Sequence, residues 1–365
     1  MSSETIKSRL HFADLLKSIA IFMVMFYHCF TSPILGTSKS FIYFGNYLIK
    51  SFLCISIPLF FLVNGGLLFN KSLSLKKHII KMLRIVVLVL IWDVLNVSTK
   101  SLFFHQPLSI SDYLKKLWHF EAGWSNHLWF LMALFVLYIF FPLMKSAYDS
   151  NKKYLLFFGV IVSLIVLGNS TANLLFSLGS VLLGKPLPEN SLNIFNQFNP
   201  ISGLYDFTFL YFILGAFLFA NASSLKKAFK KYILVFILIS SIFLLAIYGF
   251  TLSENSAVAW DPVWGGFSTI FALIAIICTY LLSLSYKFDN SRRFCQLIQI
   301  ISDCSLGIYL MQSIFTDLCR PYYVKLPISQ TLFGDFSFTV ILFLLCTLLT
   351  LILKKIPYLN HLIQI

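Results

Sequence analysis

The sequence predicts an all-α fold: one membrane-embedded domain over residues 1–365, a bundle of about ten transmembrane helices with both ends in the cytoplasm. Of its 365 residues, 58% are hydrophobic and only 12% are charged, whereas a soluble domain carries about 25% charged residues. Apolar runs long enough to cross a bilayer recur along the whole chain. Lys and Arg gather in every second connection between these runs, as cytoplasmic loops of membrane proteins do.

Each predicted span is a mostly apolar run of about 20 residues, the length that crosses a bilayer. The runs cover residues 12–32, 46–69, 79–98, 127–145, 154–169, 203–221, 232–252, 264–286, 296–316 and 332–353. The first follows Lys7 and Arg9 as in a signal peptide, but its length and the nine runs after it favour a retained helix. The segment 170–202 contains an apolar piece, Leu174 to Leu183, that we interpret as a re-entrant segment or an outward-facing helix.

The net charge of +14 comes from 28 Lys and Arg against 14 Asp and Glu. With the N-terminus inside, 20 of the 28 positive residues fall on the cytoplasmic side and 8 on the outer side. An eleventh span within 170–202 would invert the rest of the chain and destroy this pattern. No basic stripe lies on a soluble element, so the charge indicates membrane topology and excludes nucleic acid as a partner.

The seven cysteines are odd in number and include no CxxC pair. Most fall in or beside apolar runs, which predicts free thiols packed among helices and neither a disulfide framework nor a metal site.

Ionisable residues inside a span are costly and therefore indicate function. In the first span Lys17 and His28 are eleven residues apart, which returns a helix almost to its starting angle, and Asp14 precedes Lys17 by three. One helix face therefore carries an acid and a base at the cytoplasmic mouth and an imidazole in the outer half. The alternative is that Asp14 and Lys17 extend to the interface and His28 makes a helix contact.

Three further residues lie at the depth of His28 or at the edge of a span. Asp93 lies at nearly the depth of His28, where a carboxylate would fix the imidazole tautomer; a position at the headgroup level is the alternative. His127 and Trp129 open the fourth span and either contact substrate or form an interfacial belt.

The second inner loop is the densest basic segment of the chain. Its Lys81 and Arg84 share a helix face at i, i+3, and an Arg fork with a Lys charge suits phosphate oxygens. Simple topology determination is the alternative.

Several segments in chain order carry a resemblance to a known family. DLLKSIAIFMVMFYH contains a basic residue, ten residues and then His, and it is followed by IPLFFLVNGGLLF, KMLRI, HLWFLMALFVLYIFFP, YFILGAFLF and SLGIYLMQ. Together they resemble the membrane acyltransferase-3 family of bacterial cell-surface sugar O-acyltransferases. Four positions depart from its pattern: Lys17 and Lys81 stand where Arg is usual, Asn64 where Ser is common and Gln312 where His is usual.

The resemblance implies an enzyme of the bacterial cytoplasmic membrane that moves an acetyl group from cytoplasmic acetyl-CoA to a hydroxyl of a surface polysaccharide or its lipid-linked precursor. His28 would take the hydroxyl proton or carry the acyl group. The expected site has catalytic His28 and Asp93, donor-binding Lys17, Lys81, Arg84 and Asp14, and acceptor-binding His127, Trp129 and Tyr309. A glycan or polyol exporter without acyl transfer and a proton-coupled transporter are the alternatives.

Overall fold

The computed structural model describes residues 9–364 except 32–40, 104–107, 120–123, 186–191, 193, 255–259, 287 and 289–291. Every regular element in the described part of the chain is a helix, as the sequence predicts. The α-helices are α1 (His11–Cys29), α2 (Phe41–Leu53), α3 (Ser56–Phe69), α4 (Leu75–Phe103), α5 (Ile110–His119), α6 (Trp129–Ser150), α7 (Lys152–Leu182), α8 (Asp206–Ala220), α9 (Ala222–Ala228), α10 (Lys231–Glu254), α11 (Pro262–Gly266), α12 (Ile270–Ser285), α13 (Arg292–Tyr323) and α14 (Leu332–Lys355). Short 3₁₀ segments are η1 (Asn126–Leu128), η2 (Phe195–Phe198) and η4 (Leu359–Ile363).

Seven helices among the described residues are long and apolar enough to cross a membrane, or eight if the bent pair α8–α9 forms one span. Each of the ten expected ranges overlaps a helix, but the count of ten and the cytoplasmic ends stay predictions. Large apolar side chains face outward on several of these helices, such as Phe157 at 70%, Phe236 at 72% and Ile341 at 64% exposed. Contiguous apolar surface of this kind is suited to lipid rather than to water.

Helix α7 corrects the interpretation of the segment after the fifth span. The apolar piece that begins at Leu174 is neither re-entrant nor a separate helix, because it continues α7 without a break to Leu182. The Asn and Ser residues that marked a boundary are accommodated in the helix: Asn173 donates to the carbonyl of Asn169, and Ser170 donates to the carbonyl of Leu167. Polar side chains that bond back to the preceding turn do not end a helix.

Helices α3 and α8 form the closest pair in the bundle. A Cβ atom at Gly65 would lie 1.9 Å from the carbonyl oxygen of Phe212, and one at Gly215 would lie 2.0 Å from that of Leu62. Only glycine permits this approach, and small residues at helix contacts are the usual means of close packing in membranes. The pair fixes the position of α3, which forms one wall of the cavity described below.

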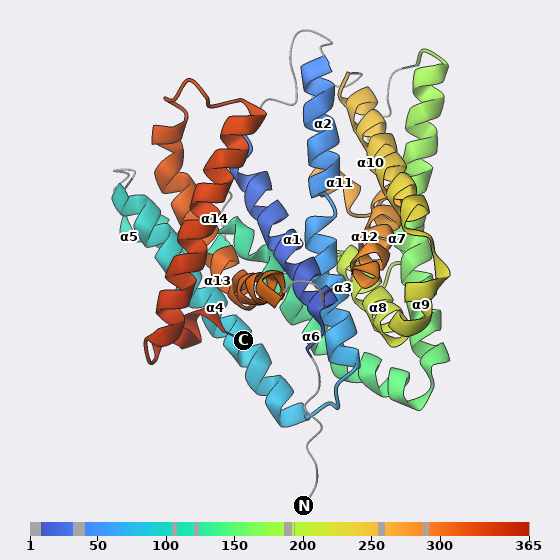
Figure 1. The fold of residues 1–365 in the computed structure, drawn as a ribbon, viewed down its shortest axis with the longest axis horizontal. Helices are drawn as coiled ribbons and strands as arrows, with labels where there is room; N and C mark the ends of the chain where they lie inside the picture. The colour runs from blue at the N-terminus through green and yellow to red at the C-terminus, as the bar shows by residue number, and fades with distance from the viewer. Residues whose placement is uncertain are drawn as a thin grey trace, which may run out of the picture.

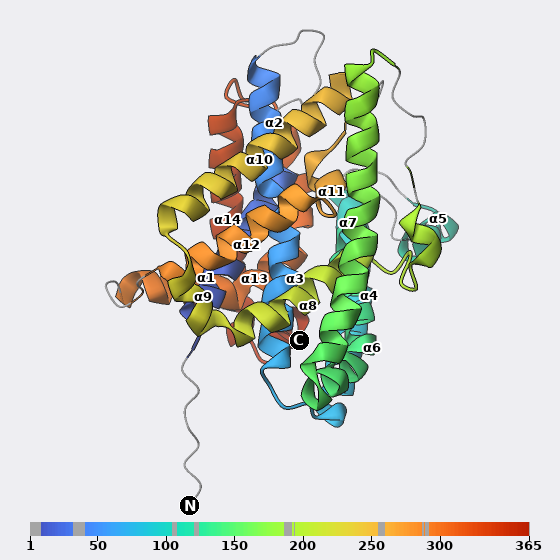
Figure 2. The same ribbon diagram turned by 90° about the vertical axis from the view of Figure 1, so that its right-hand side faces the viewer.

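Helix α1 lies at the centre of the bundle, between α13 and α14 on one side and α2 and α3 on the other (Figures 1 and 2). Leu16, Ala20, Ile21 and Met25 are completely buried. Ser18 joins α1 to α13 by donating to the carbonyl of Ile298 at 2.9 Å. A central helix that carries polar side chains holds them at fixed depths, and a catalytic site requires such fixed positions.

Candidate active site

A cavity of about 500 Å³ lies between α1, α3, α6 and α13. Six of the nine residues predicted from the sequence line it: Lys17, Lys81, His28, His127, Trp129 and Tyr309. The other three, Asp14, Arg84 and Asp93, are not among its lining residues. The predicted stripe on α1 is therefore present in part, because Lys17 and His28 face the same space.

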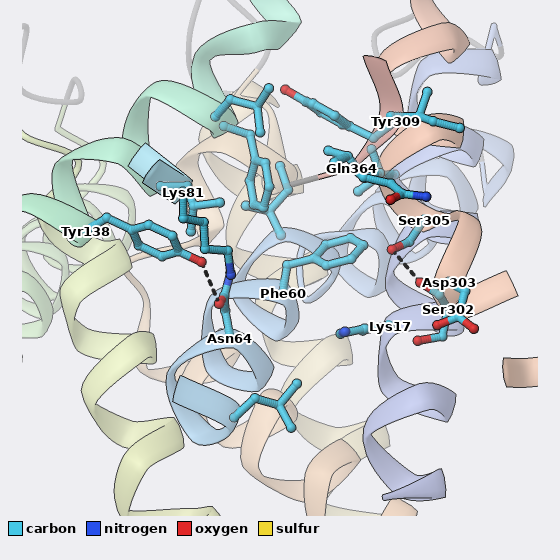
Figure 3. Close-up of a pocket in the computed structure, with 18 of the residues that line it drawn as sticks. Lys17, Phe60, Asn64, Lys81, Tyr138, Ser302, Asp303, Ser305, Tyr309 and Gln364 are labelled. Carbon is cyan, nitrogen blue, oxygen red and sulfur yellow. Dashed lines mark hydrogen bonds between the residues drawn. The ribbon is translucent and has the colours of Figure 1, made fainter. Parts of the chain in front are cut away.

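One end of the cavity is rich in lysine. Lys17 comes from α1, Lys71 from the turn after α3, Lys81 from α4 and Lys354 from the end of α14. Lys17 and Lys81 both extend into the space around Phe60 (Figure 3). No described carboxylate forms an ion pair with either of them. Four amines converging on one opening provide a site for a polyanion.

Lys81 is held beside two polar side chains of the cavity wall. Its Nζ lies 5.3 Å from the centre of the Tyr138 ring, and the Tyr138 hydroxyl donates to Asn64 Oδ1 at 3.2 Å (Figure 3). Asn64, a departure from the family pattern, thus serves as an acceptor within the wall. Arg84 is exposed on the surface of α4 instead and does not line the cavity, although it shares a face with Lys81 by spacing.

Asp14 is engaged by a partner that the sequence did not reveal. Arg9 Nε lies 2.7 Å from Asp14 Oδ2, and Arg9 Nη2 lies 2.8 Å from Asp303 Oδ1. The hydrogen bonds that Arg9 donates to the carboxylates of Asp14 and Asp303 raise the pKa of Arg9. Lys354 also donates to the backbone carbonyl of Asp303 at 2.6 Å. Asp14 therefore holds Arg9 beside Asp303, which lines the cavity, but Asp14 itself does not line it.

His28 lies at the other end, where the charged groups acting on it are Asp317, Arg320 and Lys100. Arg320 donates to the backbone carbonyl of His28, which brings this face of α13 against the end of α1. Asp317 is one turn earlier on the same face. Its Oδ2 accepts from Lys100 Nζ at 2.7 Å.

Asp93, the expected orienting carboxylate, lies elsewhere. It is 2% exposed, its Oδ1 has no hydrogen-bond partner among the described residues, and it is not among the charges that act on His28. The sequence missed Asp317 because the ninth span was expected to end at residue 316, whereas α13 continues to Tyr323. A helix one turn longer brings Asp317 into the bundle.

His127 is buried at the entrance to α6 and not in an interfacial belt. Its side chain is 6% exposed, and neither ring nitrogen has a hydrogen-bond partner among the described residues. The Tyr309 hydroxyl donates to its backbone carbonyl. The amide of Gln312, completely buried one turn after Tyr309, is also unpartnered within the described chain. Buried polar groups without partners are costly and indicate a place where a ligand or water completes them.

A further histidine lies inside the bundle in addition to His28 and His127. His78 is also buried, but its Nε2 is paired with the carbonyl of Tyr138 at 2.7 Å. This bond ties α4 to α6 and leaves the ring a structural role.

An aromatic group leads from the cavity toward the surface. The ring of Trp129 lies 5.1 Å from that of Trp264 and 5.4 Å from that of Tyr205. Trp264 is 48% exposed. Beside it the Tyr27 hydroxyl donates to Asp261 Oδ2 at 2.7 Å. Aromatic faces flanked by a carboxylate and hydroxyl groups suit a polyhydroxylated ligand.

All seven cysteines are free thiols. The described residues contain no group of three His, Cys, Asp or Glu side chains that could hold a metal ion.

Comparison with protein families confirms the family that the motifs resemble. The family described as "Acyltransferase domain" (Acyl_transf_3) matches residues 10–355, nearly the whole chain. No curated protein and no solved structure matches. The match includes the α-helices that line the cavity, and the chain belongs to the acyltransferase-3 family of membrane acyltransferases.

Proposed function

We propose that this membrane acyltransferase moves an acetyl group from cytoplasmic acetyl-CoA to a hydroxyl of a bacterial cell-surface polysaccharide or of its lipid-linked precursor. One observation carries the proposal: a single cavity joins a cluster of lysines at one end to His28 at the other. A donor with several phosphates and a long neutral arm requires this division between an anion site and a distant reaction centre.

The lysines supply the donor site. Lys17 and Lys81 have no carboxylate partner among the described residues, so their charge is available to phosphate oxygens. Lys17 and His28 are separated by eleven residues, about 16 Å along a helix axis. An extended pantetheine arm is long enough to cover such a separation, which would bring the thioester to His28.

His28 supplies the chemistry. As the sugar oxygen attacks the thioester carbonyl, the imidazole takes the hydroxyl proton; the C–S bond then breaks and the proton goes to the departing CoA sulfur. In the alternative route His28 attacks first and holds the acyl group as an acyl-imidazole, which the hydroxyl then cleaves. Both routes need a neutral imidazole.

The acceptor would approach from the aromatic side. Trp129, Tyr309 and His127 line the cavity near His28, and Trp264 extends the Trp129 surface outward. The unpartnered ring nitrogens of His127 would accept or donate hydrogen bonds to sugar hydroxyls, and the tryptophan faces would pack on the sugar ring. The donor would enter from the cytoplasmic side and the acceptor from the other side, as expected of a bacterial cytoplasmic membrane protein with both termini inside.

The direct test is analysis of the surface glycan from a strain lacking this protein. O-acetyl esters, measured by NMR of the extracted glycan, should be absent and should return with the wild-type chain. Membranes containing the protein should also transfer label from acetyl-CoA to that glycan. Loss of surface polymer with its O-acetyl esters unchanged in number per repeat, and no dependence on acetyl-CoA, would instead identify an exporter.

A further inference from the structure

The segment that follows α14 lies beyond the residues that match the family, which end at 355. It folds back into the bundle: η4 packs against α14, α13 and α4. The indole of Trp92 on α4 donates to the carbonyl of Leu362 at 2.7 Å. Ile363 is 2% exposed. The end of the segment is therefore anchored to the bundle through Leu362 and Ile363.

Two residues of this segment, Ile363 and Gln364, line the proposed active-site cavity. Figure 3 shows Gln364 beside Ser305 and below Tyr309, that is, between the level of Lys17 and the level of Tyr309. Along α13, Ser305 lies one turn before Tyr309, and Tyr309 contacts His127. Gln364 thus borders the cavity between Lys17 and Tyr309.

The Gln364 side chain is free to bind a ligand. It is exposed to the cavity, and no hydrogen bond engages it within the described part of the chain. Its amide offers two N–H donors and one carbonyl acceptor. Ile363 contributes an apolar surface next to it.

We infer that Ile363 and Gln364 bind the pantetheine arm of the acyl donor. The arm contains two amide groups and a dimethyl-substituted carbon, so it needs amide-type hydrogen bonds and an apolar contact between the phosphates and the thioester. Gln364 would provide the amide-type hydrogen bonds, and Ile363 would provide the apolar contact. The inference rests on the proposed function, and it assigns donor recognition to residues that the family match does not include.

Trp92 is a positioning residue in this arrangement. It does not line the cavity, but its bond to the carbonyl of Leu362 fixes the backbone directly before Ile363 and Gln364. Loss of that bond would let the segment shift and would weaken the contacts of both residues with the arm.

Two acyl donors, one with and one without the phosphates, distinguish the role of Gln364 from that of the lysines. Acetyl-CoA carries the arm and the phosphates, whereas acetyl-pantetheine carries the arm alone. Gln364→Ala should raise the KM for both donors by about 3- to 10-fold, since one or two hydrogen bonds are lost. Lys81→Ala should raise the KM for acetyl-CoA only. Trp92→Phe should act like Gln364→Ala, with a smaller effect.

The matched control is His361→Ala, which changes an exposed residue of the same segment that does not line the cavity. It should leave both KM values unchanged. Expression and thermal stability of each variant in detergent show that it is folded, and Gln364→Asn provides a conservative second variant with a partial effect. An unchanged KM for both donors in Gln364→Ala, or an equal rise in the KM for the acceptor, would overturn the inference.

Binding of pantetheine, measured by calorimetry without turnover, keeps this inference separate from the proposed function. Binding that is weakened by Gln364→Ala, in a protein that transfers no acetyl group, would contradict the proposed function and support the arm site. If the protein transfers acetyl groups but its affinity for pantetheine does not depend on Gln364, the proposed function is supported and the arm site is contradicted.

Discussion

Lys100 Nζ lies 2.7 Å from Asp317 Oδ2, and this ion pair between α4 and α13 is adjacent to His28. The Lys100 side chain is only 4% exposed. Its Nζ also donates to the carbonyl of Trp124 at 2.6 Å and to Ser313 Oγ at 3.0 Å. A buried ion pair with such additional partners holds its carboxylate in one place, and here the carboxylate is the one that acts on the candidate catalytic imidazole.

Asp317→Asn should therefore lower kcat by more than about tenfold, because the imidazole loses the negative charge that acts on it. It should also lower stability, because the ammonium of Lys100 stays buried without its partner charge. The double variant Lys100→Met/Asp317→Leu removes both charges and should recover most of the stability but not the activity. Asp149→Asn, which breaks the more exposed Lys145–Asp149 pair, is the control. Recovery of activity in the double variant would show that Asp317 acts only on folding.

His28→Gln should abolish acetyl transfer while expression and membrane insertion remain normal. Glutamine keeps polarity and approximate size but cannot accept the hydroxyl proton, and general acid–base catalysis supplies about 10²–10⁴-fold. The rate assay must resolve a loss of that size. His119→Gln, which changes an exposed histidine of α5, should leave the rate unchanged. Substantial turnover by His28→Gln would move the base to His127.

Lys81 and Arg84 both lie on α4, but only Lys81 lines the cavity. Lys81→Ala should raise the KM for acetyl-CoA by about tenfold, as expected when a charged hydrogen bond to phosphate is lost, with little change in the KM for the acceptor. Arg84→Ala, which the sequence predicted to act similarly, should have little effect because Arg84 is exposed outside the cavity. An effect of Arg84→Ala as large as that of Lys81→Ala would mean that the donor extends over the surface of α4.

Charge at position 17 should matter more than the kind of side chain. Lys17→Arg should retain activity and Lys17→Ala should lose it, because Lys17 lines the lysine-rich end of the cavity without an ion-pair partner among the described residues and its charge is needed by a phosphate. Donor-dependent initial rates distinguish the variants. Full activity of Lys17→Ala would show that the residue serves only to reach the membrane interface.

The topology is tested with reporters fused after Lys231 and after Lys355. Both should be active only as cytoplasmic reporters, because 20 of the 28 Lys and Arg residues then lie on the inner side. A fusion in the segment 186–191 should report the outer side, since α7 is long enough to cross the membrane. A signal from the outside at Lys231 or Lys355 would contradict ten spans.

Local sequence was sufficient to predict the helices and part of the site. A span depends on about 20 consecutive apolar residues, and a shared helix face depends on spacing within one helix. For that reason Lys17 and His28 were placed correctly on one face of α1 and both line the cavity. The error at α7 arose from the opposite case, where polar residues that usually mark a boundary bond to their own helix.

The rest of the site was decided by packing between helices that are distant in the chain. Asp317 reaches the surroundings of His28 because Arg320 joins α13 to the end of α1. Gln364 reaches the same cavity because Trp92 holds the segment after α14. Hydropathy and periodicity describe one helix at a time and contain no information on which faces meet. The sequence by itself therefore determined the membrane class, the helical segments and the shared face of Lys17 and His28 on α1. Only the tertiary structure decided which carboxylate acts on His28 and which residues complete the cavity, because both depend on contacts between helices that are distant in the chain.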